Sequence, residues 1–311
     1  MDSDEREIDT QFPWLVIPYF NGDHGLPSQR PLTKVAPPVI GWLCPAIRVQ
    51  GVNYVAAPGT YLPDEPLHIT VDVDNRGVPN AMVKLQVYWS VPGTGFVSQA
   101  LATLSRPVAG RSKTGPARFG PIIWTPDDAS IPPHFCLLAH VSCTPPEPDA
   151  GPPTPSPMTD RHWAQYNLQT AVLNNARGHH ATVFWAVNPA AEAAAYMVTA
   201  RPLTEEQLRT VARVVRAEPV AIRSHQLSLN RASDVAAVRE GREPGLLLAL
   251  ERGERQALVV TTRELTLGPQ QFTAVEMVQT RVGDERVADV TGSLGLVLLG
   301  HVEDHCRVRR R

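Results

Sequence analysis

The fold is decided by the stretch Leu67-His-Ile-Thr-Val-Asp-Val-Asp74, in which apolar and polar residues alternate without a break. Side chains two residues apart in a strand point to the same side of the sheet. One side of this segment is therefore aliphatic, and the other carries a histidine, a threonine and two aspartates. That pattern predicts a strand with one face in the core and one face in water. The following Asn75-Arg-Gly77 consists of residue types that favour tight turns.

Segments with the same alternation lie further along the chain, separated by glycine and proline. They cover residues 83–89, 135–141, 164–172, 181–187, 194–200, 246–250, 256–262, 271–279 and 294–302. One helix is expected near 204–217, because Thr204 and Gln207 form a capping box and Pro219 ends the apolar periodicity that follows. The sequence predicts an all-β protein of two tandem immunoglobulin-like antiparallel β-sandwiches, the second with this one inserted helix.

Composition divides the chain into four parts. We expect residues 1–40 to form an extended arm rich in proline and aromatic residues. The two sandwiches are expected over 41–176 and 177–304, and a basic tail over 305–311. The boundary between the sandwiches is placed in the polar, turn-forming segment from Leu173 to His180.

The stretch Thr144–Met158 holds seven prolines in fifteen residues and has the composition of a linker. Strand patterns at 135–143 and 164–172 are placed to pair with each other. We therefore interpret it as a long, stiff hairpin loop.

Charge and composition exclude several classes of protein. The 311 residues carry 29 basic and 31 acidic side chains, which gives a net charge of -2. This charge does not favour a protein that binds the phosphate backbone of nucleic acid. No apolar run approaches the ~20 residues that span a bilayer, and the acidic N-terminal stretch does not resemble a signal peptide, so a cytoplasmic location is expected. Only three of the basic residues are lysines, a bias typical of a GC-rich bacterial genome. The four cysteines are expected to be reduced, and they are Cys44, Cys136, Cys143 and Cys306.

Residues about 40–176 resemble the CARDB family, immunoglobulin-like modules named for cell adhesion in bacteria. The stretch from Leu67 to Gly77, followed by Ala81-Met-Val-Lys-Leu-Gln-Val-Tyr-Trp89, is similar to the strand, Asn-x-Gly turn and strand of that family. Three later segments are similar to its closing strands, namely Ile123-Trp-Thr-Pro126, His134-Phe-Cys-Leu-Leu-Ala-His-Val141 and Ala164-Gln-Tyr-Asn-Leu168. The resemblance implies a seven-strand sandwich used for binding or assembly, and it brings no catalytic residue.

One group of candidate metal ligands lies on a single predicted strand. His134, Cys136 and His140 point to the same side, whereas Cys143 points to the other. Structural zinc sites use ligand pairs borne on turns, so ordinary packing is the favoured interpretation, and no metal or cofactor is expected. Thr291-Gly-Ser-Leu-Gly295 lacks the first glycine of a nucleophile elbow.

These observations favour a non-catalytic protein-binding or scaffolding protein of a bacterial assembly. A protein partner is expected to contact two groups of residues, Phe12, Trp14, Tyr19 and Phe20 in the arm and Pro148, Pro152 and Pro155 in the loop. Deletion of residues 146–156 is then expected to spare folding. The alternatives are a hydrolase whose site is assembled only by the fold, or a carbohydrate-binding module with exposed tryptophans. For the arm, the alternative is that it packs across the chain's own sandwiches.

Overall fold

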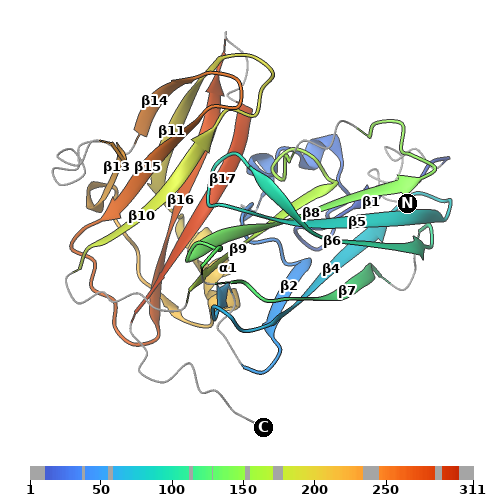
Figure 1. The fold of residues 1–311 in the computed structure, drawn as a ribbon, viewed down its shortest axis with the longest axis horizontal. Helices are drawn as coiled ribbons and strands as arrows, with labels where there is room; N and C mark the ends of the chain where they lie inside the picture. Colours follow the sequence, from blue (N-terminus) through green and yellow to red (C-terminus); the bar gives the residue numbers. More distant parts are fainter. Residues whose placement is uncertain are drawn as a thin grey trace.

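The computed structural model describes residues 11–36, 39–54, 59–111, 115–127, 129–150, 155–170, 178–233, 245–283 and 289–300. Within them, the chain forms two β-sandwiches that pack against each other, with one α-helix (Figure 1). The prediction of an all-β fold of immunoglobulin-like sandwiches is confirmed.

The first sandwich consists of a five-stranded and a four-stranded sheet. The five-stranded sheet has the order β3 (Thr60–Tyr61), β9 (Trp163–Thr170), β8 (His134–Thr144), β5 (Ala81–Ser90) and β6 (Ser98–Val108). In the other sheet β4 (Leu67–Asn75) pairs with β1 (Leu15–Val16), β2 (Ile47–Gly51) and β7 (Ala117–Trp124). Two short 3-10 helices, Pro27–Gln29 and Leu32–Lys34, lie between β1 and β2.

The aliphatic side of β4 lies in the core as predicted, and every second residue from Leu67 to Val73 is fully buried. The polar side of β4 is less exposed to solvent than the alternation predicted. Asp72 is buried between Arg48 of β2 and Arg118 of β7, at 2.6 and 3.0 Å. Ion pairs with the two neighbouring strands thus replace much of the water expected at this aspartate.

The second sandwich consists of a three-stranded and a five-stranded sheet. The three-stranded sheet has the order β10 (His180–Val187), β15 (Arg255–Thr262) and β13 (Leu227–Arg231). In the other, β16 (Gln271–Val282) pairs with β11 (Ala194–Pro202), β12 (Glu218–Pro219) and β17 (Asp289–Leu299), and β14 (Gly245–Leu250) pairs with β11. A 3-10 helix, Ser224–Gln226, precedes β13.

The predicted helix is α1 (Glu205–Val215), between β11 and β12. Its capping box forms as expected, because the Thr204 side chain accepts from the Gln207 N–H and the Gln207 side chain accepts from the Thr204 N–H. The apolar residues of α1 pack against the core of the first sandwich. The helix therefore belongs to the second sandwich by sequence and to the first by packing.

The proline-rich stretch is a hairpin loop, as predicted. Strands β8 and β9 pair antiparallel from His134 with Gln169 to His140 with Trp163. The loop joins the ends of these two strands within one sheet. The proposed boundary from Leu173 to His180 lies mostly outside the described residues.

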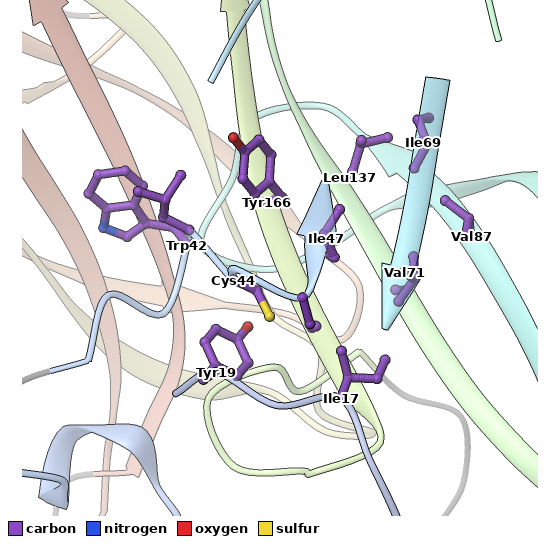
Figure 2. Packing of buried hydrophobic residues seen from close by; sticks show 14 of the residues in the cluster. Ile17, Tyr19, Trp42, Cys44, Ile47, Ile69, Val71, Val87, Leu137 and Tyr166 are labelled. Carbon is purple, nitrogen blue, oxygen red and sulfur yellow. The ribbon is translucent and has the colours of Figure 1, made fainter. Parts of the chain in front are cut away.

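The N-terminal segment packs into the first sandwich. Leu15 and Val16 form β1 against the end of β4, and Ile17 is fully buried. Figure 2 shows Tyr19 beside Cys44, with Tyr166 of β9 on the other side of Cys44 and Ile17 further along the N-terminal segment. Residues 15–19 are thus part of the core, which is the alternative interpretation given above for the arm.

A row of side-chain amides joins the two sandwiches. Gln165 donates to the carbonyl of Ser293 (3.1 Å), Asn167 to that of Gly295 (2.9 Å), and Gln169 to that of Val297. Donors and acceptors each advance by two residues, so β9 and β17 run in the same direction and their periods match. Strand β17 is at the edge of its sheet, and these amides satisfy the carbonyls on its open side.

Small residues let the two sandwiches approach closely. Figure 2 shows the Trp42 indole at the end of the buried cluster opposite Val71 and Val87. A Cβ atom at Gly295 would lie 1.9 Å from this ring. At Gly292 it would lie 1.5 Å from the carbonyl oxygen of Thr94. Neither contact leaves room for a side chain.

The loop between β5 and β6 makes the third junction contact. The N–H of Trp185 in β10 donates to the Pro92 carbonyl, and the Trp185 carbonyl accepts from the Thr94 N–H, both at 2.9 Å. The Thr94 hydroxyl also donates to the Gln279 side chain of β16. Both sheets of the second sandwich are therefore tied to the first.

We expect Gly295→Ala to destabilise the protein by about 2 kcal/mol, because the new methyl overlaps the Trp42 ring. The measurement is the free energy of unfolding in urea. Gly283→Ala is the matched control, since no atom lies within 4 Å of its added Cβ. Equal stability of the two variants would show that the junction is looser than described.

Candidate functional site

The predicted arm residues differ in how accessible they are. Phe12 is 39% exposed, whereas Trp14 and Phe20 are half-buried. Tyr19 is buried, and its hydroxyl donates to the Gly41 carbonyl and accepts from the Gln165 N–H, both at 2.9 Å. The position of Tyr19 leaves it no surface for a partner. Phe12 has the most accessible side chain of the four.

The predicted loop residues belong to a segment that also holds a buried carboxylate. Pro148 is exposed and Pro155 half-buried, while Pro152 lies outside the described residues. Between them and β8, Glu147 is buried and accepts from Arg161 (2.9 Å) and from the Leu15 N–H (2.9 Å). One carboxylate thus ties the loop to the N-terminal segment.

Arg161 extends this connection. It also forms a 2.5 Å ion pair with Asp149, and its guanidinium lies 3.7 Å from the centre of the Trp14 ring. Such a stacked cation contributes about 1 kcal/mol or more when partly desolvated. Deletion of residues 146–156 removes Glu147 and Asp149, the two carboxylates that bind Arg161. We therefore expect this deletion to destabilise the fold, contrary to the sequence-based expectation.

His162 completes the cluster between two carboxylates. Its Nδ1 lies 2.7 Å from Asp160 and its Nε2 lies 3.0 Å from Glu147. Burial alone would lower the pKa of His162, but the hydrogen bonds to Asp160 and Glu147 raise it to about 9. The ring is therefore a cation at neutral pH with both N–H groups donated to carboxylates.

A pocket of about 250 Å³ opens beside this cluster. It is lined by His140, Cys143, Glu147, Asp160 and His162, with Gln86, Val141, Ser142, Pro146 and Ala150. Burial and the Glu147 charge raise the pKa of the Cys143 thiol to about 12. Burial lowers the pKa of His140 to about 4, and its ring stacks on Trp163 at 4.4 Å. The thiol stays protonated and His162 has no free nitrogen, so these groups do not form a nucleophile and base pair.

The predicted metal candidates share one side of β8, as expected, but do not converge. His134 lines a pocket at the junction, Cys136 lies 3.7 Å from the Gln165 amide, and His140 stacks on Trp163. Within the described ranges no three His, Cys, Asp or Glu residues are grouped to hold a metal ion. Cys44, Cys136 and Cys143 are unbridged, and Cys306 lies outside the described residues.

The junction holds a second and larger pocket of about 390 Å³. The first sandwich contributes Pro92, Pro132, Pro133, His134 and Gln169 to its lining, and the second contributes His180, Ala181, Thr182, Val183 and Leu296. Sequence reasoning missed this pocket, because its walls come together only through the contact between the sandwiches.

The six tryptophans are buried or half-buried. Trp42 and Trp163 are 1% exposed, and Trp124 packs edge-on against Phe135 at 5.4 Å. Trp14, Trp89 and Trp185 are half-buried. The prediction that Trp42, Trp89 and Trp124 pack in or against the core is confirmed. None of the six offers the flat, open ring that stacks on a sugar.

Comparisons with known proteins find distant likenesses only. No family model matches the chain, and no curated protein matches it. A CARDB domain from Pyrococcus furiosus, solved in complex with di-metal ions, has 13% sequence identity and a TM-score of 0.26, over 40% of this chain and 91% of that domain. Red sea bream transglutaminase has 8% identity and a TM-score of 0.24, over 83% of this chain and 31% of the enzyme.

A tip adhesin from Pseudomonas aeruginosa has 12% identity and a TM-score of 0.19, over 80% of this chain and 97% of the adhesin. These likenesses are too distant to transfer a role to any residue. The chain has a distantly immunoglobulin-like fold. Among the described residues, no helix combines the length and the apolar character needed to cross a bilayer.

We expect the stability of the protein to fall as pH rises through about 9, because the folded state holds the His162 proton more tightly than the unfolded state does. The stabilisation that comes from the raised pKa is fully present below the unfolded pKa of about 6.5 and is lost as the pH rises through the folded pKa. It amounts to at most about 3 kcal/mol of unfolding free energy. The measurement is urea unfolding from pH 6 to 10 for the wild type and His162→Gln. The difference in stability between the two should shrink across this range, and a constant difference would contradict the charged state of His162.

We expect Tyr19→Phe to cost about 2 kcal/mol, because the Gly41 carbonyl and the Gln165 N–H lose their buried partner while the ring stays in place. Tyr88→Phe is the matched control, since Tyr88 is more accessible and its hydroxyl forms no hydrogen bond within the described part of the chain. Thermal unfolding of both variants tests the packing of the N-terminal segment. A neutral Tyr19→Phe variant would mean that this segment is held less firmly than described.

Proposed function

We propose that the protein is a non-catalytic protein-binding or scaffolding protein of a bacterial assembly, which presents loops from two β-sandwiches locked together. The observation that supports this most directly is the use made of the buried polar groups. Glu147 and Arg161 bind the loop to the N-terminal segment, and the side-chain amides of β9 bind the second sandwich to the first. Such a body holds exposed loops in fixed positions, as a binding scaffold requires.

The two rival functions have weaker support. A hydrolase needs an activated nucleophile, and the pocket beside the loop holds a protonated thiol and a doubly hydrogen-bonded imidazolium. A carbohydrate-binding module needs exposed rings, and the tryptophans are at most half-exposed. The thiol, the imidazolium and the tryptophan rings are thus poorly suited to these two functions.

The test is recovery of a partner with the tagged full chain from its native host, followed by sedimentation of the purified pair. We expect a defined complex that Pro148→Asp weakens at least tenfold, because Pro148 lies exposed on the anchored loop. Val78→Asp, at an exposed turn of the same sandwich, is the control and should bind normally. Absence of any complex, together with turnover of ester, phosphoester or peptide substrates, would favour the hydrolase.

A further inference from the structure

Strand β10 is an edge strand with only part of its outer side occupied. It pairs along its whole length with β15. On the other side, Trp185 bonds through its N–H and its carbonyl to the loop at Pro92 and Thr94. Outward-directed residues alternate along a strand, so the N–H and carbonyl groups of Val183 and Ala181 point to the same side. In the described part of the chain, no main-chain group from another segment bonds to them there.

The junction pocket lies directly beside this open half of β10. Ala181 and Val183 form part of its wall, and Val183 is 52% exposed. Pro92, at the end of the occupied half of β10, lines the same pocket. At about 390 Å³ it falls within the range of pockets that bind small molecules or single large side chains. A row of free main-chain groups beside a side-chain pocket is the arrangement by which sheet edges bind extended peptides.

The chemistry of the lining selects an uncharged occupant. Among the described residues that line the pocket there is no Asp, Glu, Lys or Arg. Burial, with a smaller effect of His180, lowers the pKa of His134 to about 4, and burial also lowers the pKa of His180. Both rings are neutral at pH 7, so a charged group entering this pocket would lose water without gaining a counter-charge.

We propose that the open half of β10 and the junction pocket form one docking surface for an extended segment of a protein partner. The segment adds as a strand beside Ala181–Val183 and places an uncharged apolar side chain in the pocket. The proposal rests on the proposed function and specifies the partner's binding mode. A small apolar molecule would fill the pocket but leave the outward groups of β10 without partners.

The test begins with a library of random dodecapeptides displayed on phage and selected on the immobilised full chain. Selected peptides are synthesised, and their affinity is measured by fluorescence anisotropy. We expect uncharged, apolar sequences whose affinity falls at least tenfold when alternate peptide nitrogens are methylated, because those N–H groups pair with β10. Methylation at the intervening positions should change the affinity little.

Two variants test the site on the protein. Val183→Pro removes an N–H to which no main-chain carbonyl bonds within the described residues, so the strand should form while peptide affinity falls at least tenfold. Val183→Thr keeps the N–H and the branched shape, and should bind as the wild type does. Should Val183→Pro fail to fold, the methylated peptides still decide the matter.

The proposal is overturned if no peptide is enriched, if enriched peptides tolerate methylation at every position, or if a folded Val183→Pro variant binds them as the wild type does. The two proposals fail in different ways. A partner recovered by the full chain and bound equally by Val183→Pro would keep the proposed function and remove this docking surface.

Discussion

Three hydrogen bonds from the side-chain amides of β9 to the carbonyls of β17 hold the structure together as one body. An edge strand with free carbonyls must be covered, or it invites pairing with another chain. Here the edge strand β17 of the second sandwich lies on the outer face of the first. The side-chain amides of Gln165, Asn167 and Gln169 bind the β17 carbonyls that a neighbouring strand would otherwise bind. The close approach of Gly295 to Trp42 depends on the same contact. The two sandwiches are therefore fixed in their relative position.

The fixed junction creates the surface that carries the functional proposals. The junction pocket has walls from both sandwiches, and the open half of β10 begins where the loop at Pro92 stops pairing. Just before the start of β9, Glu147 and Arg161 hold the N-terminal segment by buried hydrogen bonds, as the amides of β9 hold β17. In both places buried polar groups hold segments in position, and the proposed binding surfaces lie on the loops and edges that stay exposed.

The sequence predicted the inward faces well, because alternation over eight residues, as in Leu67–Asp74, is explained by burial of one face alone. It predicted the capping box of α1 and the β8–β9 hairpin for similarly local reasons. It did not predict the role of Gln165, Asn167 and Gln169, since alternation shows that a face is polar but not what covers it. The burial of Glu147 was not predicted for the same reason: a carboxylate in a proline-rich loop is expected to be solvated, and its partner Leu15 lies 132 residues away in sequence.

The central claim, that the sandwiches form one cooperative unit, is tested most directly by native-state hydrogen exchange in increasing urea. Core amides of β4 and β5 in the first sandwich, and of β15 and β16 in the second, should exchange through one opening with the same free energy and the same urea dependence. In the triple variant Gln165→Ala, Asn167→Ala and Gln169→Ala, the two sets should separate. Two distinct openings in the wild type, with different urea dependences, would contradict the account.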